Sequence, residues 1–121
     1  MAKVLGLEHV TITTPVELEA EVVEWYGSCI GLPRLDKPSD GHGGAWFAAG
    51  EQQIHVMIDP HNPPKDAHFC FQVDDFEGFV AALRTAGCHI EQAPARSGTK
   101  RCFTRDPAGN SVEIVAVTEG S

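Results

Sequence analysis

The chain has 121 residues and a formal net charge of −8. This length is sufficient for one domain with its own hydrophobic core, without disulfides or structural metals. Hydrophobic residues make up 42% of the chain and charged residues 21%, which is ordinary for a globular protein. The negative charge argues against nucleic acid or an anionic membrane as partner. No apolar run approaches the roughly 20 residues that a bilayer-spanning helix needs.

The cysteine spacing and the N-terminal residues indicate the cellular compartment of the protein. None of the four cysteines forms a Cys-x-x-Cys pair, so neither a zinc knuckle nor a redox motif is indicated. The first residues lead into a strand-like segment and lack the apolar stretch and cleavage site of a signal peptide. We therefore expect a cytoplasmic protein with reduced thiols.

The first half of the chain is predicted to begin with a strand and a helix. Residues 4–13 alternate as a strand does. A helix is expected to follow, with Thr14 as N-cap and Pro15 in the first helical position. Gly31 is expected to end it.

Three more strands are expected in the first half. Residues 33–37 are compatible with a short edge strand. The segments 45–49 and 52–58 alternate around the pair Gly50-Glu51, which suits a two-residue hairpin turn. This first half therefore reads strand, helix, three strands.

The second half repeats this order. It follows a proline-rich joint at residues 59–66, and we divide the domain into module one, 1–60, and module two, 61–121. The expected elements of module two are a strand over 67–73, a helix capped by Asp74 or Asp75 and ended by Gly87, and strands over 90–93 and 100–105 with a last strand beginning at Ser111.

The two halves place metal-ligand residue types at matching positions. His9 and His68 lie in the first strands of the two halves, and His55 and Glu113 lie in the last strands. His55 follows His9 by 46 residues, and Glu113 follows His68 by 45. Each of these residues lies on the strand face opposite the apolar one. One such residue is more often structural, but four at equivalent positions indicate a metal centre.

The hairpins predict the neighbours of these residues. Trp46 should lie opposite His55, and Phe103 opposite Glu113, as two aromatic walls. Arg101 should lie at the rim of the cavity as a cation. Ordinary core packing is the alternative for the two aromatic residues, and a solvated edge is the alternative for Arg101.

The sequence resembles the vicinal oxygen chelate superfamily, which includes glyoxalases, fosfomycin- and bleomycin-resistance proteins and extradiol dioxygenases. The resemblance covers nearly the whole chain and is carried by Leu7-Glu8-His9-Val10-Thr11, Trp25-Tyr26-Gly27-Ser28-Cys29-Ile30-Gly31-Leu32, Ile54-His55-Val56, Ala67-His68-Phe69 and Asp106-Pro107-Ala108-Gly109-Asn110-Ser111-Val112-Glu113.

The resemblance implies an α+β fold of paired βαβββ modules whose curved mixed sheet surrounds a metal-binding cavity, commonly in a homodimer. The family's metal ligands map onto His9, His68 and Glu113, and His55 occupies the position of a further ligand in glyoxalase-type members. The site lies within one chain in some members and across the dimer in others, and both arrangements stay open. A divalent ion is implied: Mn, Fe, Co, Ni or Zn.

The resemblance also implies a function. We expect a metal-dependent lyase, isomerase or thiol transferase that chelates the oxygens of a small, anionic or thiol-linked substrate. Glu113 and Thr11 are the candidate catalytic residues, and Trp46, Phe103 and Arg101 the candidate substrate-binding residues. The alternatives are an Fe(II) extradiol-type dioxygenase and a non-catalytic drug-binding protein of the bleomycin-resistance type.

Overall fold

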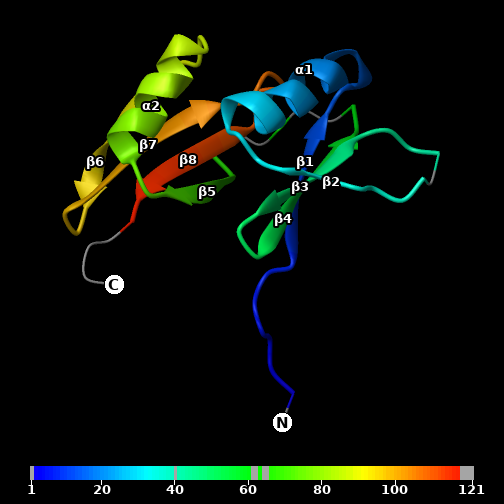
Figure 1. The fold of residues 1–121 in the computed structure, drawn as a ribbon, viewed down its shortest axis with the longest axis horizontal. Helices are drawn as coiled ribbons and strands as arrows, with labels where there is room; N and C mark the ends of the chain where they lie inside the picture. Colours follow the sequence, from blue (N-terminus) through cyan, green and yellow to red (C-terminus); the bar gives the residue numbers. More distant parts are fainter. Residues whose placement is uncertain (1, 40, 61–62, 64–65, 118–121) are drawn as a thin grey trace. The chain divides into compact units, whose positions relative to one another are not determined.

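The computed structural model describes residues 2–39, 41–60, 63 and 66–117. The chain divides into two compact units, Met1–His61 and Asn62–Ser121. Each unit contains a four-stranded mixed sheet and helical segments in the same order (Figure 1). We refer to them as unit one and unit two and describe each by itself.

Unit one contains a sheet with the strand order β1-β4-β3-β2. β1 runs parallel to β4, and the other neighbours are antiparallel. Its elements are β1 (His9–Thr14), a 3-10 turn (Val16–Leu18), α1 (Glu19–Glu24), a π turn (Trp25–Cys29), β2 (Arg34–Leu35), β3 (Ala45–Ala49) and β4 (Gln52–Ile58).

Unit two repeats this topology with the strand order β5-β8-β7-β6. β5 runs parallel to β8, and the other neighbours are antiparallel. Its elements are β5 (His68–Val73), α2 (Phe76–Thr85), β6 (Glu91–Arg96), β7 (Thr99–Arg105) and β8 (Ser111–Ala116). The sequence therefore predicted the α+β class and the repeated strand–helix–three-strand order correctly.

One face of each sheet is apolar and forms the core with the unit's own helix. This follows from the alternation of side chains along a strand, which puts every second residue on the same face. Burying a large aliphatic or aromatic side chain contributes about 1.5–3 kcal/mol, so these residues supply most of the stabilisation. The buried core residues are Ile12, Val22, Trp25, Tyr26, Ile30, Ala45, Phe47, Ile54 and Val56 in unit one, and Val80, Leu83, Cys102, Val112 and Ile114 in unit two.

Two turns fix the register of the last strands. In unit one, Gly50 has a φ of +62°, and Ala49 pairs with Gln52, as the sequence predicted. In unit two, the Asp106 carboxylate closes the loop between β7 and β8. Its Oδ1 accepts from the backbone N–H groups of Ala108 and Asn110, both at 2.9 Å.

The start of the first helix was predicted wrongly. Thr14 is not an N-cap but the last residue of β1, where it pairs with Ile58 and its carbonyl accepts from the N–H of Asp59. Its buried hydroxyl donates to the carbonyl of Pro15 at 3.0 Å. The helical segment therefore starts with a 3-10 turn that has no side-chain cap.

Two further strand boundaries differ from the prediction by more than two residues. β1 begins at His9 and not at residue 4, although the carbonyl of Glu8 already accepts from Gln53. β6 extends to Arg96 and contains a register shift between Ala93 and Arg96. This irregularity is a β-bulge or its equivalent, and it changes where the following side chains point.

Candidate functional site

The polar faces of the two sheets have the same layout. In unit two, Cys70, Glu113, Phe103 and Glu91 form one row across the four strands. In unit one, Thr11, His55, Trp46 and Leu35 form the corresponding row. His68 precedes Cys70 by two residues and His9 precedes Thr11 by two, so the predicted ligands occupy equivalent places.

In unit two, His68 and Glu113 are brought together. Nε2 of His68 lies 3.1 Å from Oε1 of Glu113. The Glu113 residue is buried, with 5% of its surface exposed, whereas 35% of the His68 side chain is exposed. The ring of Phe103 stands edge-on to the His68 ring, at 5.0 Å between centroids.

The hydrogen bonds of His68 define what can lie between it and Glu113. Its Nδ1 lies 2.9 Å from the backbone carbonyl of Asp66, which can only accept, so Nδ1 carries the proton. In the neutral ring Nε2 then has a lone pair, which faces a carboxylate oxygen that also has only lone pairs. A proton, held by the ring or by the carboxyl group, or a metal ion must therefore lie between these two atoms. This is the arrangement of a histidine ligand oriented by a carbonyl.

The second oxygen of Glu113 faces two guanidinium groups. Nη1 of Arg101 lies 3.5 Å from Oε2, and Nη2 of Arg96 lies 3.9 Å from the same atom. Arg101 is held in place, because its Nε donates to the carbonyl of Pro94 at 3.1 Å. Its guanidinium also lies 5.6 Å from the centre of the Phe103 ring.

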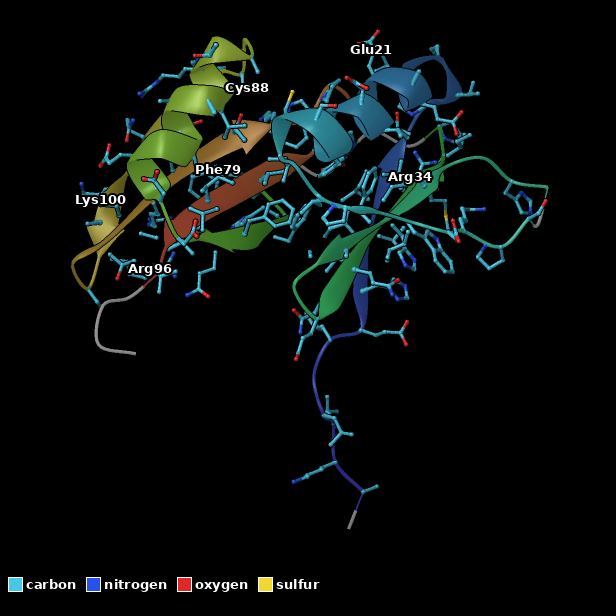
Figure 2. The ribbon with its side chains drawn as sticks, in the orientation of Figure 1. Glu21, Arg34, Phe79, Cys88, Arg96 and Lys100 are labelled. Carbon is cyan, nitrogen blue, oxygen red and sulfur yellow. The ribbon has the colours of Figure 1, made fainter. Side chains whose placement is uncertain are left out.

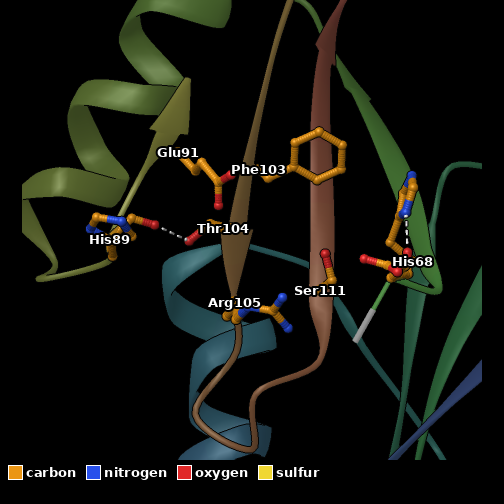
Figure 3. Close-up of a pocket in the computed structure, with 8 residues that line it drawn as sticks. His68, His89, Glu91, Phe103, Thr104, Arg105 and Ser111 are labelled. Carbon is orange, nitrogen blue, oxygen red and sulfur yellow. Dashed lines mark hydrogen bonds between the residues drawn. The ribbon is translucent and has the colours of Figure 1, made fainter. Parts of the chain in front are cut away.

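A pocket of about 390 Å³ lies beside His68 in unit two. Figure 3 shows the side chains around it, with the hydroxyl of Thr104 donating to the carbonyl of His89 at 2.9 Å. Its wall combines a phenyl ring and two imidazoles with charged and hydroxyl groups, so it can hold a small polar molecule. The lining residues are Asp66, His68, His89, Glu91, Phe103, Thr104, Arg105 and Ser111.

In unit one, the rings of His9, His55 and Trp46 form a stack. His55 lies between the other two, at 4.0 Å from His9 and 4.2 Å from Trp46 between ring centroids. Nε2 of His55 is 2.8 Å from Oε1 of Gln53, and Nδ1 of His9 is 3.1 Å from Oε1 of Glu8. Neither contact uses Nε2 of His9 or Nδ1 of His55, so these are the two ring nitrogens that a metal could take without displacing one of them.

Two groups on these faces have shifted pKa values. Burial lowers the pKa of His55, and the charge of His9 lowers it further, while Glu8 raises it. His55 is therefore neutral near pH 7, which is the form that binds metals. Burial and then Glu113 raise the pKa of Cys70 to about 11, so this thiol is protonated near neutrality and is a poor nucleophile.

The sequence of this chain matches a known protein family. The family model for the Glyoxalase/Bleomycin resistance protein/Dioxygenase superfamily matches residues 6–114. The chain belongs to this superfamily. Among curated proteins no significant match is found.

Solved structures show the same fold as this superfamily member. One is a protein from Bacillus anthracis assigned to the glyoxalase family, with 32% identity and a TM-score of 0.90, covering 98% of this chain and 99% of that one. The lactoylglutathione lyase of Agrobacterium tumefaciens has 20% identity and a TM-score of 0.76, covering 95% and 96%. TnmS3, an antibiotic-binding protein from a Streptomyces species, has 15% identity and a TM-score of 0.79, covering 98% and 100%.

Two of these structures are of proteins with different functions. The fold occurs in an enzyme, the lactoylglutathione lyase, and in an antibiotic-binding protein, TnmS3. The superfamily assignment therefore does not distinguish catalysis from binding, which depends on the site. In the part of this chain that the structure describes, no helix is both long and apolar enough to cross a membrane.

The structure brings the predicted site residues of this superfamily member together within each unit. His68, Glu113, Phe103 and Arg101 meet in unit two, and His9, Thr11, His55 and Trp46 meet in unit one. Among the described residues, no group of three or more His, Cys, Asp or Glu side chains is placed to hold a metal ion. The ligand set of four thus stays a prediction that joins the pair of unit one to the pair of unit two.

Sequence reasoning missed Arg96 and most of the pocket. Arg96 reaches Glu113 from the irregular end of β6, which strict alternation along a strand cannot reveal. Arg105 and Ser111, which line the pocket, pair across β7 and β8 in the row next to Glu113. That row was implied by the hairpin register and was the available signal for both residues. Glu91, the first residue of β6, and His89, two residues before it, complete the wall.

Proposed function

We propose that this chain is a divalent-metal-dependent enzyme that acts on a small molecule, as a lyase, isomerase or thiol transferase of the glyoxalase and fosfomycin-resistance type. The observation that carries the proposal is the contact between Nε2 of His68 and Oε1 of Glu113. Two electron-pair donors face one another there, next to a pocket of suitable size. His9 is the proposed third ligand and His55 the fourth.

The donor set fits a divalent transition ion. Neutral imidazoles and one carboxylate suit Mn²⁺, Fe²⁺, Co²⁺, Ni²⁺ or Zn²⁺. Three or four protein ligands on a six-coordinate ion leave positions for substrate. When bound, such an ion supplies Lewis acidity that binds two neighbouring substrate oxygens and stabilises negative charge on them.

The chain's own residues supply orientation and proton transfer. The carbonyl of Asp66 fixes the ring of His68, so that its Nε2 faces the site. Phe103 and Trp46 are proposed as the aromatic walls that exclude water from one side of the substrate. The hydroxyl of Thr11 can donate a hydrogen bond to a substrate oxygen, and the carboxylate of Glu113 is the proposed proton acceptor.

Metal binding tests this proposal directly. Protein purified without chelator should contain about one divalent ion per chain by elemental analysis, and added metal should raise Tm after treatment with EDTA. At 100 times Kd the expected stabilisation is about 2.7 kcal/mol. His68→Ala and Glu113→Gln should abolish the rise in Tm, whereas His42→Gln, a change of an exposed histidine, should not. Absence of metal uptake by the unaltered protein would refute the proposal.

The two-histidine, one-carboxylate set also fits an Fe(II) extradiol-type dioxygenase. Anaerobic loading with Fe²⁺ followed by oxygen and a panel of catechols distinguishes this reaction. Oxygen uptake with ring cleavage would support it, and no uptake with any catechol would exclude it.

A non-catalytic binding protein is the second candidate. The specific observation in its favour is the ring stack of unit one, because two imidazoles stacked face to face do not aim their nitrogens at one point. A binding role predicts that drug affinity survives the His68→Ala and Glu113→Gln substitutions. Loss of both metal and ligand binding in these variants would favour the enzyme.

We propose that the protein is a homodimer, whether it is an enzyme or a binding protein.

A further inference from the structure

Arg96 and Arg101 lie beside the carboxylate of Glu113. We propose that Arg96 and Arg101 form a subsite for a substrate carboxylate, and that the substrate is therefore an organic acid that also carries two neighbouring metal-binding oxygens. This inference rests on the proposed metal-dependent function and adds the substrate class to it. Arg96 was not among the sequence-predicted site residues. Figure 2 shows it at the end of β6.

The distances show that the hydrogen-bonding capacity of the arginines is not used up. The contacts to Oε2 of Glu113 are 3.5 Å for Arg101 and 3.9 Å for Arg96. A charge-assisted hydrogen bond is shorter, about 2.7–2.9 Å, and a guanidinium has five N–H donors in a flat fork. The two groups thus lie near Glu113 without being saturated by it. A second carboxylate can take the remaining donors.

Arg101 is already fixed in the position that such a ligand needs. Its side chain is only 18% exposed, because Nε donates to the carbonyl of Pro94 and the guanidinium lies over the Phe103 ring. A cation that is held before the ligand arrives loses little conformational entropy on binding. The Arg96 side chain is 70% exposed and provides a second, adaptable donor.

The charges also favour an anion here. Two guanidinium groups face one buried carboxylate, and the proposed ion would add two further positive charges. Glu91, in the same row as Glu113, is the opposing charge on this face and is exposed at the sheet edge. The two guanidinium groups offset Glu113 and Glu91, so this face would become positive once the proposed ion is bound, although the whole chain carries a net charge of −8.

The geometry of arginine points to a carboxylate. Its planar fork matches the two oxygens of a carboxylate, whereas lysine would act as a point charge. The arginines lie around Oε2, and the proposed metal would bind at Oε1 of the same group. The substrate carboxylate and its chelating oxygens would accordingly lie within one small molecule.

A matched pair of probes tests the subsite. Protein loaded with Ni²⁺, which avoids oxygen chemistry, is titrated by calorimetry with 3,4-dihydroxybenzoate and with 3,4-dihydroxybenzamide. Both carry the same neighbouring oxygens and differ only in the charge of the third group. We expect the benzoate to bind about 10- to 100-fold more tightly.

Substitutions assign this preference to the two arginines. Arg101→Gln should remove most of the preference for the benzoate over the benzamide, and Arg96→Gln should remove part of it. The affinity for the benzamide should stay within about twofold of that of the unaltered protein. Arg84→Gln, a change of an exposed arginine in the last turn of α2, should leave both affinities unchanged. Metal affinity is measured for each variant, because a role only in positioning Glu113 would lower metal affinity and weaken both probes equally.

The outcomes separate this inference from the proposed function. Equal binding of the two probes to the unaltered protein would overturn the carboxylate subsite and leave the metal-dependent function intact. Equal weakening of both probes in Arg101→Gln would also overturn it, in favour of a positioning role. Binding of neither probe by metal-loaded protein would contradict both, and failure to take up Ni²⁺ would contradict the function itself.

Discussion

At the scale of single residues, the two oxygens of Glu113 have different partners. Oε1 faces the imidazole of His68, and Oε2 faces the guanidinium groups of Arg96 and Arg101. Cations on the Oε2 side draw the carboxylate toward a fixed orientation without occupying the oxygen that faces His68. A carboxylate on a side chain that is only 7% exposed needs such partners, since an unpaired charge would be costly to bury.

Cys102 provides a prediction on pH dependence. It is fully buried in the core of unit two, and burial raises the pKa of its thiol from 9.0. Above pH 9 the unfolded chain loses this proton while the folded chain keeps it, so the thiol's contribution to stability is present below pH 9 and is lost as pH rises. The free energy of unfolding, from urea titrations at pH 8 and pH 10, should fall less in Cys102→Ala than in the unaltered protein. An equal fall in both would contradict the raised pKa.

At the scale of elements, the loop before β8 fixes the position of Glu113. The Asp106 carboxylate binds two backbone N–H groups, and its Oδ2 accepts from the side-chain nitrogen of Asn110 at 2.8 Å. These bonds hold the β7–β8 hairpin in the register that places Phe103 opposite Glu113. The loop is therefore a support of the site as well as a turn.

Substituting Asp106 should show this. Asp106→Ala leaves buried donors without acceptors, each at a cost of about 1–3 kcal/mol, so we expect a loss of about 3 kcal/mol in unfolding free energy. Asp106→Asn keeps an acceptor for the backbone and should lose about 1 kcal/mol. Chemical denaturation measures both, with Asp74→Ala as an exposed control expected within about 0.5 kcal/mol of the unaltered protein. A loss for Asp106→Ala no larger than for the control would show that the hydrogen bonds of the loop do not contribute to the free energy of unfolding.

The sequence specified the strand pairings well because alternation and turn residues determine register locally. The partners of His55 and Glu113 follow from hairpin turns alone, and Trp46 and Phe103 are opposite them as predicted. The predicted start of the first helix was wrong because a Thr-Pro pair is equally compatible with the end of a strand and with the N-terminus of a helix. Only the pairing of Thr14 with Ile58 decides between these two. Arg96 was not predicted as a site residue because the irregular end of β6 breaks the alternation of side chains along the strand.

At the scale of the whole molecule, the two units share one topology but carry different side chains on their polar faces. Each unit keeps the same strand order, and in each the histidine of the first strand lies one row from the predicted ligand in the last strand. Unit two has an imidazole and a carboxylate in contact, whereas unit one has a stack of rings. The two pairs have thus diverged in chemistry on one backbone plan. The acid–base pair of unit two is the stronger half of the proposed centre.

Variants in the two units test whether one centre uses both pairs. We expect His9→Ala and His68→Ala each to lose most of the bound metal, measured by elemental analysis, and His55→Ala to lower affinity less. Full metal content in His9→Ala would restrict the centre to unit two. Mixing His9→Ala with His68→Ala chains after partial unfolding should restore about a quarter of the sites if a centre is shared between subunits, and none if it lies within one chain.

The backbone carbonyl of Asp66 has one further consequence for mutagenesis. It determines which nitrogen of His68 faces Glu113, yet replacing the Asp66 side chain leaves that carbonyl in place. A scan that truncates side chains one by one would therefore miss its influence on the imidazole tautomer. An ester in place of the Asp66–Ala67 amide, made by semisynthesis, would weaken that acceptor while keeping every side chain.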